Sequence, residues 1–226
     1  MRIYDDRYER ERLRFQVAMH FIRLEARTRT IRLWTGLTDD RIRKLYRSYL
    51  CDGERPLPRH RGRSPHRVGM FLRTARLRQQ TSMLASLCRL SGAAPEHPAA
   101  SEHPTAPGHA AAAGFTLTLP SLMRGAQLCQ AYEVYRALTP EPMLGFEHAV
   151  FLLTTLAHAN ELVYGVCRDC RATVVVDHWS LRPARCTVCA AEADVELTGR
   201  RATASSPTGA SARPSLPAGR ESVAAA

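Results

Sequence analysis

The chain has 226 residues, 45% of them hydrophobic, and a formal net charge of +11. This length suits one or two modest domains that can bury a core. No apolar run approaches the roughly 18 residues of a membrane-spanning helix, and no signal peptide is visible. We therefore expect a cytoplasmic protein without a membrane partner.

The basic residues are concentrated in the first part of the chain. Residues 1–91 contain 22 Arg or Lys and nine Asp or Glu, whereas residues 92–226 contain 10 and 12. A basic segment joined to a near-neutral remainder indicates a polyanionic partner, most simply nucleic acid. Because 31 of the 32 basic residues are Arg, a skew in genomic base composition is an alternative source of this charge.

Residues 5–33 are predicted to form one long helix, because apolar side chains recur at steps of three and four. The stripe consists of Leu13, Val17, Phe21, Leu24, Thr28 and Ile31. Arginines and glutamates occupy the other faces. A solvated polar face is the simpler interpretation, and docking of this helix against a partner chain is the alternative.

A second, basic helix is predicted after residues 34–36. Thr38 can cap its free N–H groups, and Asp39 and Asp40 lie at the positive end of its dipole. Helix, glycine-containing turn and short basic helix together form a helix-turn-helix-like unit, although ordinary helical hairpins share this pattern. The residues expected to contact DNA are Arg41, Arg43, Lys44 and Arg47.

Residues 52–69 are rich in Pro, Gly and Arg and show no periodicity, which predicts a loop. This loop is either a solvated linker or a phosphate-binding segment. Its candidate DNA contacts are Arg59, Arg61, Arg63 and Arg67. Helical periodicity resumes over 70–90 and completes a basic helical region over 1–90.

Residues 91–119 are dominated by Ala, Pro and His and are predicted to be a flexible insertion. Core helices are expected over 120–165, one at 122–138 and an apolar one at 143–164. Residues 198–226 are predicted to be a disordered tail. Cys51, Cys88 and Cys129 have no partner motif and are interpreted as inert packing residues.

Two CxxC pairs dominate residues 166–197, the segment predicted to be a zinc ribbon. Fifteen residues separate Cys167-Arg-Asp-Cys170 from Cys186-Thr-Val-Cys189. Zn²⁺ takes four thiolates tetrahedrally, and each pair can point two sulfurs at one ion. A β-branched run at 173–176 predicts a strand between the pairs. We expect one structural zinc per chain; two disulfides or a CxxC redox site are the alternatives.

These elements predict a mainly α fold, a multi-helix N-terminal body followed by a small four-cysteine zinc ribbon. The segment from Trp34 to Tyr46 (WTGLTDDRIRKLY) and the cysteines after Leu162 (LVYGVCRDC, then CTVC) resemble the FlhC family. That family is the zinc-binding subunit of the bacterial flagellar master transcriptional activator. The similarity covers about residues 10–90 and 120–190.

The resemblance implies zinc at Cys167, Cys170, Cys186 and Cys189. It also implies an FlhD-type partner subunit, promoter DNA, activation of flagellar class 2 operons and recruitment of RNA polymerase. Family members usually carry a Trp after the basic helix, whereas residues 63–71 contain none, as in a divergent copy.

Two other functions remain open on sequence grounds. One is a zinc-containing helical adaptor that binds only protein. The other is a thiol–disulfide enzyme that uses the CxxC pairs, which predicts a low thiol pKa. No glycine-rich phosphate loop, nucleophile elbow or carboxylate pair with a supporting base is present, so we expect no enzyme.

Overall fold

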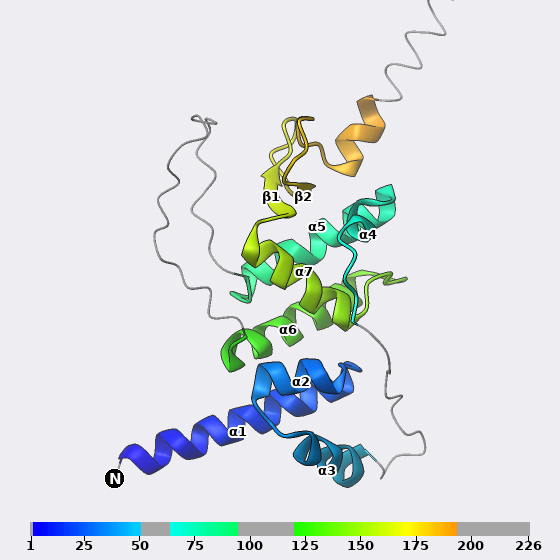
Figure 1. Ribbon diagram of the computed structural model, residues 1–226. Helices are drawn as coiled ribbons and strands as arrows, with labels where there is room; N and C mark the ends of the chain where they lie inside the picture. The colour runs from blue at the N-terminus through cyan, green and yellow to red at the C-terminus, as the bar shows by residue number, and fades with distance from the viewer. Residues whose placement is uncertain (1, 51–63, 95–119, 194–226) are drawn as a thin grey trace, which may run out of the picture. The chain divides into compact units, whose positions relative to one another are not determined.

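The computed structural model describes residues 2–50, 64–94 and 120–193. The chain divides into two compact units, residues 1–190 and 191–226. The first unit is mainly helical and contains one two-stranded sheet (Figure 1). No described helix has the length and apolar character that crossing a membrane would require.

The first region contains three helices, α1 (Arg2–Arg23), α2 (Thr28–Thr35) and α3 (Asp39–Leu50). The prediction of one continuous helix over 5–33 is therefore wrong. The chain turns at Glu25, whose φ of 61° lies in the left-handed region. Ala26 N–H donates to the Phe21 carbonyl across this turn, at 2.8 Å.

Contacts with a distant helix explain this break. The Arg27 backbone N–H and the Thr30 hydroxyl donate to the two carboxylate oxygens of Glu147, at 2.8 and 3.0 Å. Thr30 and Ile31 are buried in consequence, together with Trp34. A straight helix could not place all of these side chains against the core.

The start of α3 agrees with the prediction. Gly36 ends α2 with a φ of 67°, and the Thr38 hydroxyl accepts a hydrogen bond from Arg41 N–H at 3.4 Å. Asp39 and Asp40 lie in the first turn, where carboxylates favour the helix dipole. Ile42 is fully buried, which fixes the basic side chains on the outer faces of α3.

The middle of the unit consists of α4 (Gly69–Leu72), α5 (Ala75–Leu90), α6 (Leu122–Leu138) and α7 (Phe146–His158). Thr74 caps α5 and Ser121 caps α6, each accepting from an N–H three residues later at 3.2 Å. Phe146 of α7 packs against α1 and α6, because the centre of its ring lies 5.0 Å from the ring centre of Phe21 and 5.3 Å from that of Tyr132.

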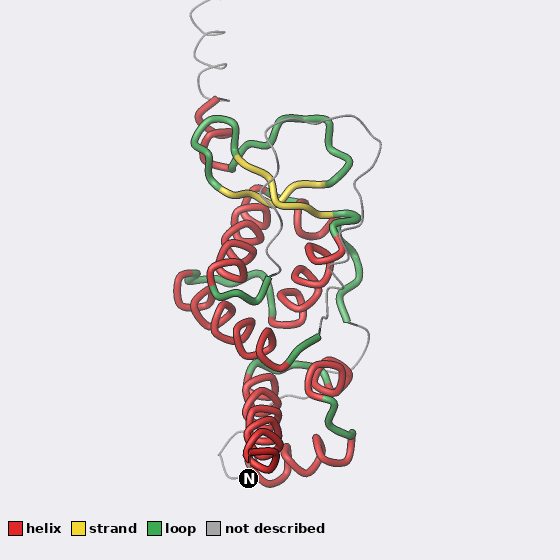
Figure 2. The backbone as a smooth tube through the Cα atoms, turned by 90° about the vertical axis from the view of Figure 1, so that its left-hand side faces the viewer, coloured by secondary structure: helices red, strands yellow, loops and turns green. Residues whose placement is uncertain are grey.

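The sheet pairs β1 (Leu162–Val166) with β2 (Thr173–Asp177) in antiparallel register, Leu162 opposite Asp177 and Val166 opposite Thr173. The strand at 173–176 is thus confirmed, whereas the predicted helix over 143–164 ends at His158 and its last residues form β1. Figure 2 shows this hairpin in yellow with its loops in green. Tyr164 OH and Val175 N–H attach it to α5, donating to Ala85 O at 3.2 Å and Ser82 Oγ at 3.0 Å.

Candidate metal centre and basic surface

The four predicted cysteines converge at one end of the hairpin. The sulfurs of Cys167, Cys170, Cys186 and Cys189 all lie within 4.8 Å of one another. Cys167 is buried, Cys170 is exposed, and the other two are half-buried. The first pair lies in the turn between β1 and β2, and the second at the start of the helical residues 187–193.

Backbone contacts bring the second pair to the first. Arg168 N–H donates to the Ala184 carbonyl at 3.0 Å. Arg185 forms an ion pair with Asp169 at 3.0 Å, and Asp169 belongs to the first CxxC. The fifteen-residue connection therefore returns to its start, as the spacing predicts.

The contacts within the cluster have the geometry of a metal knuckle. Cys186 N–H points to the Cys167 sulfur at 3.3 Å, and Cys189 N–H to the Cys186 sulfur at 3.4 Å. Arg171 follows the first pair in a left-handed conformation, with a φ of 63°. Backbone N–H groups of Cys170 and Cys186 lower the pKa of Cys167 to about 6, whereas the hydrogen bond with Cys186 raises the pKa of Cys189. The convergence of the four sulfurs, and not these opposed pKa shifts, therefore supports a metal site.

The donor set fits a zinc ion. A tetrahedral site with Zn–S bonds of about 2.3 Å has sulfurs about 3.8 Å apart, and the sulfurs of Cys170 and Cys186 are 3.6 Å apart. A disulfide bond is about 2.05 Å long, and the six described cysteines are free. Asp177 lies outside the cluster and accepts from Trp179 N–H at 2.8 Å.

The two other described cysteines are buried. Burial raises the pKa of both Cys88 and Cys129 to about 12, so both stay protonated at neutral pH. This agrees with their interpretation as inert packing residues. Cys51 lies outside the described residues.

The predicted DNA-contacting residues of α3 are all exposed, but they differ in their neighbours. Arg41 lies 3.8 Å from Glu11 and 5.6 Å from the Phe15 ring centre, and Arg43 binds Asp40 at 3.0 Å. Lys44 and Arg47 form no ion pair with any described residue. They are therefore the cations of α3 most available to an external anion.

The structure does not bring the whole predicted basic surface together. Arg59, Arg61 and Arg63 lie outside the described residues. Arg67 is described and exposed, and it lines a cleft beside α7 rather than the outer face of α3. Sequence reasoning missed this cleft, because its walls come from segments more than 100 residues apart.

Comparisons with known proteins leave the family open. No protein-family model matches the chain, and no curated protein matches it either.

Proposed function

We propose that this chain is a DNA-binding subunit of a transcriptional activator of the FlhC type. It would act with an FlhD-type partner at flagellar class 2 operons and recruit RNA polymerase. The observation that carries this proposal is the outer face of α3, where exposed basic side chains alternate with buried Ile42 and Leu45. The sequence resemblance over the same helix supports it.

The basic face of α3 would bind mainly phosphates. Exposed Arg and Lys side chains bind phosphate at a small cost in free energy, because each exchanges water and counterions for a phosphate oxygen. Lys44 and Arg47 have no competing described carboxylate. Arg41 and Arg43 would first have to leave Glu11 and Asp40, at the small cost typical of exposed ion pairs.

The cysteine cluster would support this surface indirectly. A zinc ion bound by the four sulfurs would crosslink the two CxxC segments, 167–170 and 186–189. Asp169 and Arg185 hold the same segments together, and β2 ties them to α5. This part would act in local folding, so removing a sulfur would disturb the cysteine end of the hairpin and leave the helices that carry the basic surface in place.

The proposal is tested by fluorescence anisotropy with a labelled duplex from a flagellar promoter, with and without the FlhD-type partner. We expect Lys44→Gln with Arg47→Gln to weaken binding and to reduce the salt slope by about one per lost contact. Arg78→Gln, an exposed arginine on α5, is the matched control. Equal binding by the double variant and the control would refute DNA contact by α3.

A protein-binding adaptor is the second candidate, and the surface near the cysteine cluster favours it. Trp179 is 77% exposed and Leu181 fully so, with Val188 at 59%. Exposed apolar side chains in one region indicate a protein contact. This function would be supported if the chain binds its protein partner but binds no promoter DNA, either alone or in the complex.

A further inference from the structure

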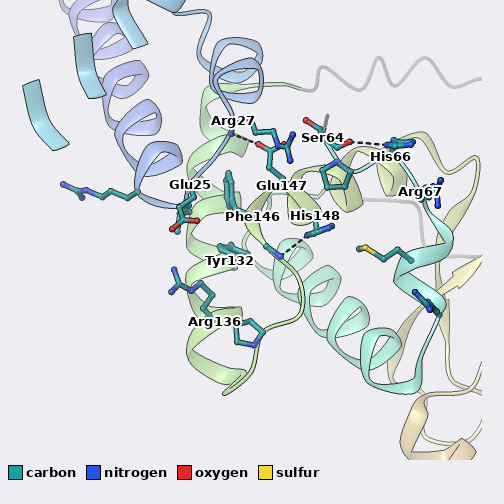
Figure 3. A pocket seen from close by; sticks show the side chains of 17 residues that line it. Glu25, Arg27, Ser64, His66, Arg67, Tyr132, Arg136, Phe146, Glu147 and His148 are labelled. Carbon is teal, nitrogen blue, oxygen red and sulfur yellow. Dashed lines mark hydrogen bonds and ion pairs between the residues drawn. The ribbon is translucent and has the colours of Figure 1, made fainter. Parts of the chain in front are cut away.

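A second basic site lies in a cleft between α6, the start of α7 and the segment 64–73. The cleft has a volume of about 870 Å³, within the range of small-molecule pockets. Figure 3 shows its labelled side chains, including Arg27, Arg67, Arg136 and His148. These residues come from four separate parts of the chain.

Positive charge predominates in this cleft. Its lining includes five arginines and two glutamates. The arginines are Arg23, Arg27, Arg67, Arg73 and Arg136. Among the described residues, Arg27 forms an ion pair with Glu147, and the other four arginines form none. The lining of the cleft therefore carries more positive than negative charge.

Glu147 forms an ion pair with Arg27 but accepts no hydrogen bond from its guanidinium. Its two oxygens already accept hydrogen bonds from Arg27 N–H and from Thr30. The Arg27 Nε lies 4.0 Å from the carboxylate, beyond hydrogen-bonding distance. Both Nε and Nη1 of Arg27 are buried without an acceptor. Unpaired buried donors on a charged group are costly, so a bound anion would stabilise this side chain.

His148 adds a donor of defined orientation. Its Nδ1 accepts a hydrogen bond from Gly145 N–H at 3.1 Å, drawn as a dashed line in Figure 3. In the neutral ring the proton then lies on Nε2, which leaves an N–H available for a ligand. The cleft thus combines arginine forks with a neutral imidazole donor.

We propose that this cleft binds a small phosphorylated molecule of about nucleotide size. Arginine forks match phosphate oxygens in bidentate geometry, and several arginines along one cleft suit an anion of two or more charges. The DNA backbone is the other source of the same chemistry. The proposal does not depend on the DNA-binding role of α3, because Arg23, Arg27 and Arg136 belong to other elements.

The test uses the full chain in its metal-loaded form, with isothermal titration calorimetry at physiological salt. ADP is the probe, adenosine the uncharged comparison and pyrophosphate the base-free comparison. We expect ADP to bind, adenosine not to bind, and Arg23→Gln with Arg136→Gln to weaken ADP binding about tenfold or more. Both arginines are exposed, so the variant should fold. Arg78→Gln again controls for charge.

Duplex DNA in the same variants distinguishes the source of the phosphate. If ADP and pyrophosphate do not bind, but the double variant loses DNA affinity relative to Arg78→Gln, the cleft binds backbone phosphate. If neither probe nor DNA responds to the double variant, the proposal is wrong. In that case Lys44→Gln with Arg47→Gln still tests the role of α3 separately.

Discussion

His148 illustrates how one side chain links local structure to pH dependence. It lies in the first turn of α7, where its Nδ1 accepts from the Gly145 N–H and satisfies a free backbone donor. Burial, opposed by Glu147 and assisted by Arg27, lowers the pKa of this histidine below its usual value. The folded protein therefore favours the neutral ring, which is also the form that accepts from Gly145.

The lowered pKa of His148 predicts a loss of stability in mild acid. Since the unfolded chain binds the proton more tightly, stability is complete above the ordinary pKa of about 6.5 and declines as pH falls below it. We expect His148→Gln to flatten this decline between pH 7.5 and 5.5, because Gln does not titrate. Gln can still cap the helix, so the variant should keep the native fold. Urea unfolding at both pH values measures the effect.

The exposed His66, which lies near the Ser64 carbonyl at 3.4 Å, supplies the control. His66→Gln, a substitution of the same kind outside α7, is measured in parallel as the control for the exchange itself. An identical decline in the His148→Gln and native proteins would contradict the assignment.

Helix α6 packs closely against α1 and α2. Gly125 permits this approach, because a Cβ at this position would lie 3.2 Å from Val17 Cγ1 and 3.3 Å from the Trp34 ring. Both neighbours are buried, so neither can move into solvent. The absence of a side chain at one residue therefore sets the spacing of α6 from α1 and α2.

We predict that Gly125→Ala destabilises the protein. Overpacking a core typically costs about 1–3 kcal/mol, and the gain in helix propensity offsets up to about 1 kcal/mol. A decrease in the free energy of unfolding of about 1 kcal/mol is therefore expected in urea titration. Gly69→Ala is the matched control, because nothing lies within 4 Å of its Cβ position. Equal stability of the two variants would argue against close packing at Gly125.

Local signals predicted the elements that local interactions stabilise. The cap at Thr38, the helix at 122–138 and the spacing of the CxxC pairs depend on residues close in sequence. The break at Glu25 could not be predicted, because the groups that stabilise it reach Glu147, 120 residues away from Arg27. The segment from Leu162 to Val166 is apolar like the helix before it, and only pairing with β2 makes it a strand.

At the scale of the whole unit, the cysteine cluster and the helical body are joined through the hairpin. Val174 and Val175 are buried, and Val175 N–H donates to Ser82 on α5. The sulfurs lie at the far end of the strands, held by contacts among residues 167–190. The base of the hairpin thus belongs to the helical core, whereas its cysteine end is held by its own short-range contacts and has four sulfurs that could bind a metal ion.

This division predicts that metal removal unfolds only part of the hairpin. Elemental analysis should first give one zinc per chain, and a chelator or Cys186→Ser should remove it. Hydrogen exchange should then accelerate at the amides of Cys186 and Cys189, which point to sulfurs. The Val175 amide should stay protected, because its acceptor lies on α5.

A matched variant separates the metal from the sequence change. Thr187→Ser alters a residue between two of the cysteines without removing a sulfur, so its zinc content and exchange rates should equal those of the native chain. Simultaneous exchange of Val175 and the cysteine amides after chelation would show that zinc stabilises the whole hairpin. Zinc-free protein with unchanged exchange would instead mean that Asp169, Arg185 and the backbone contacts hold the cysteine end without a metal.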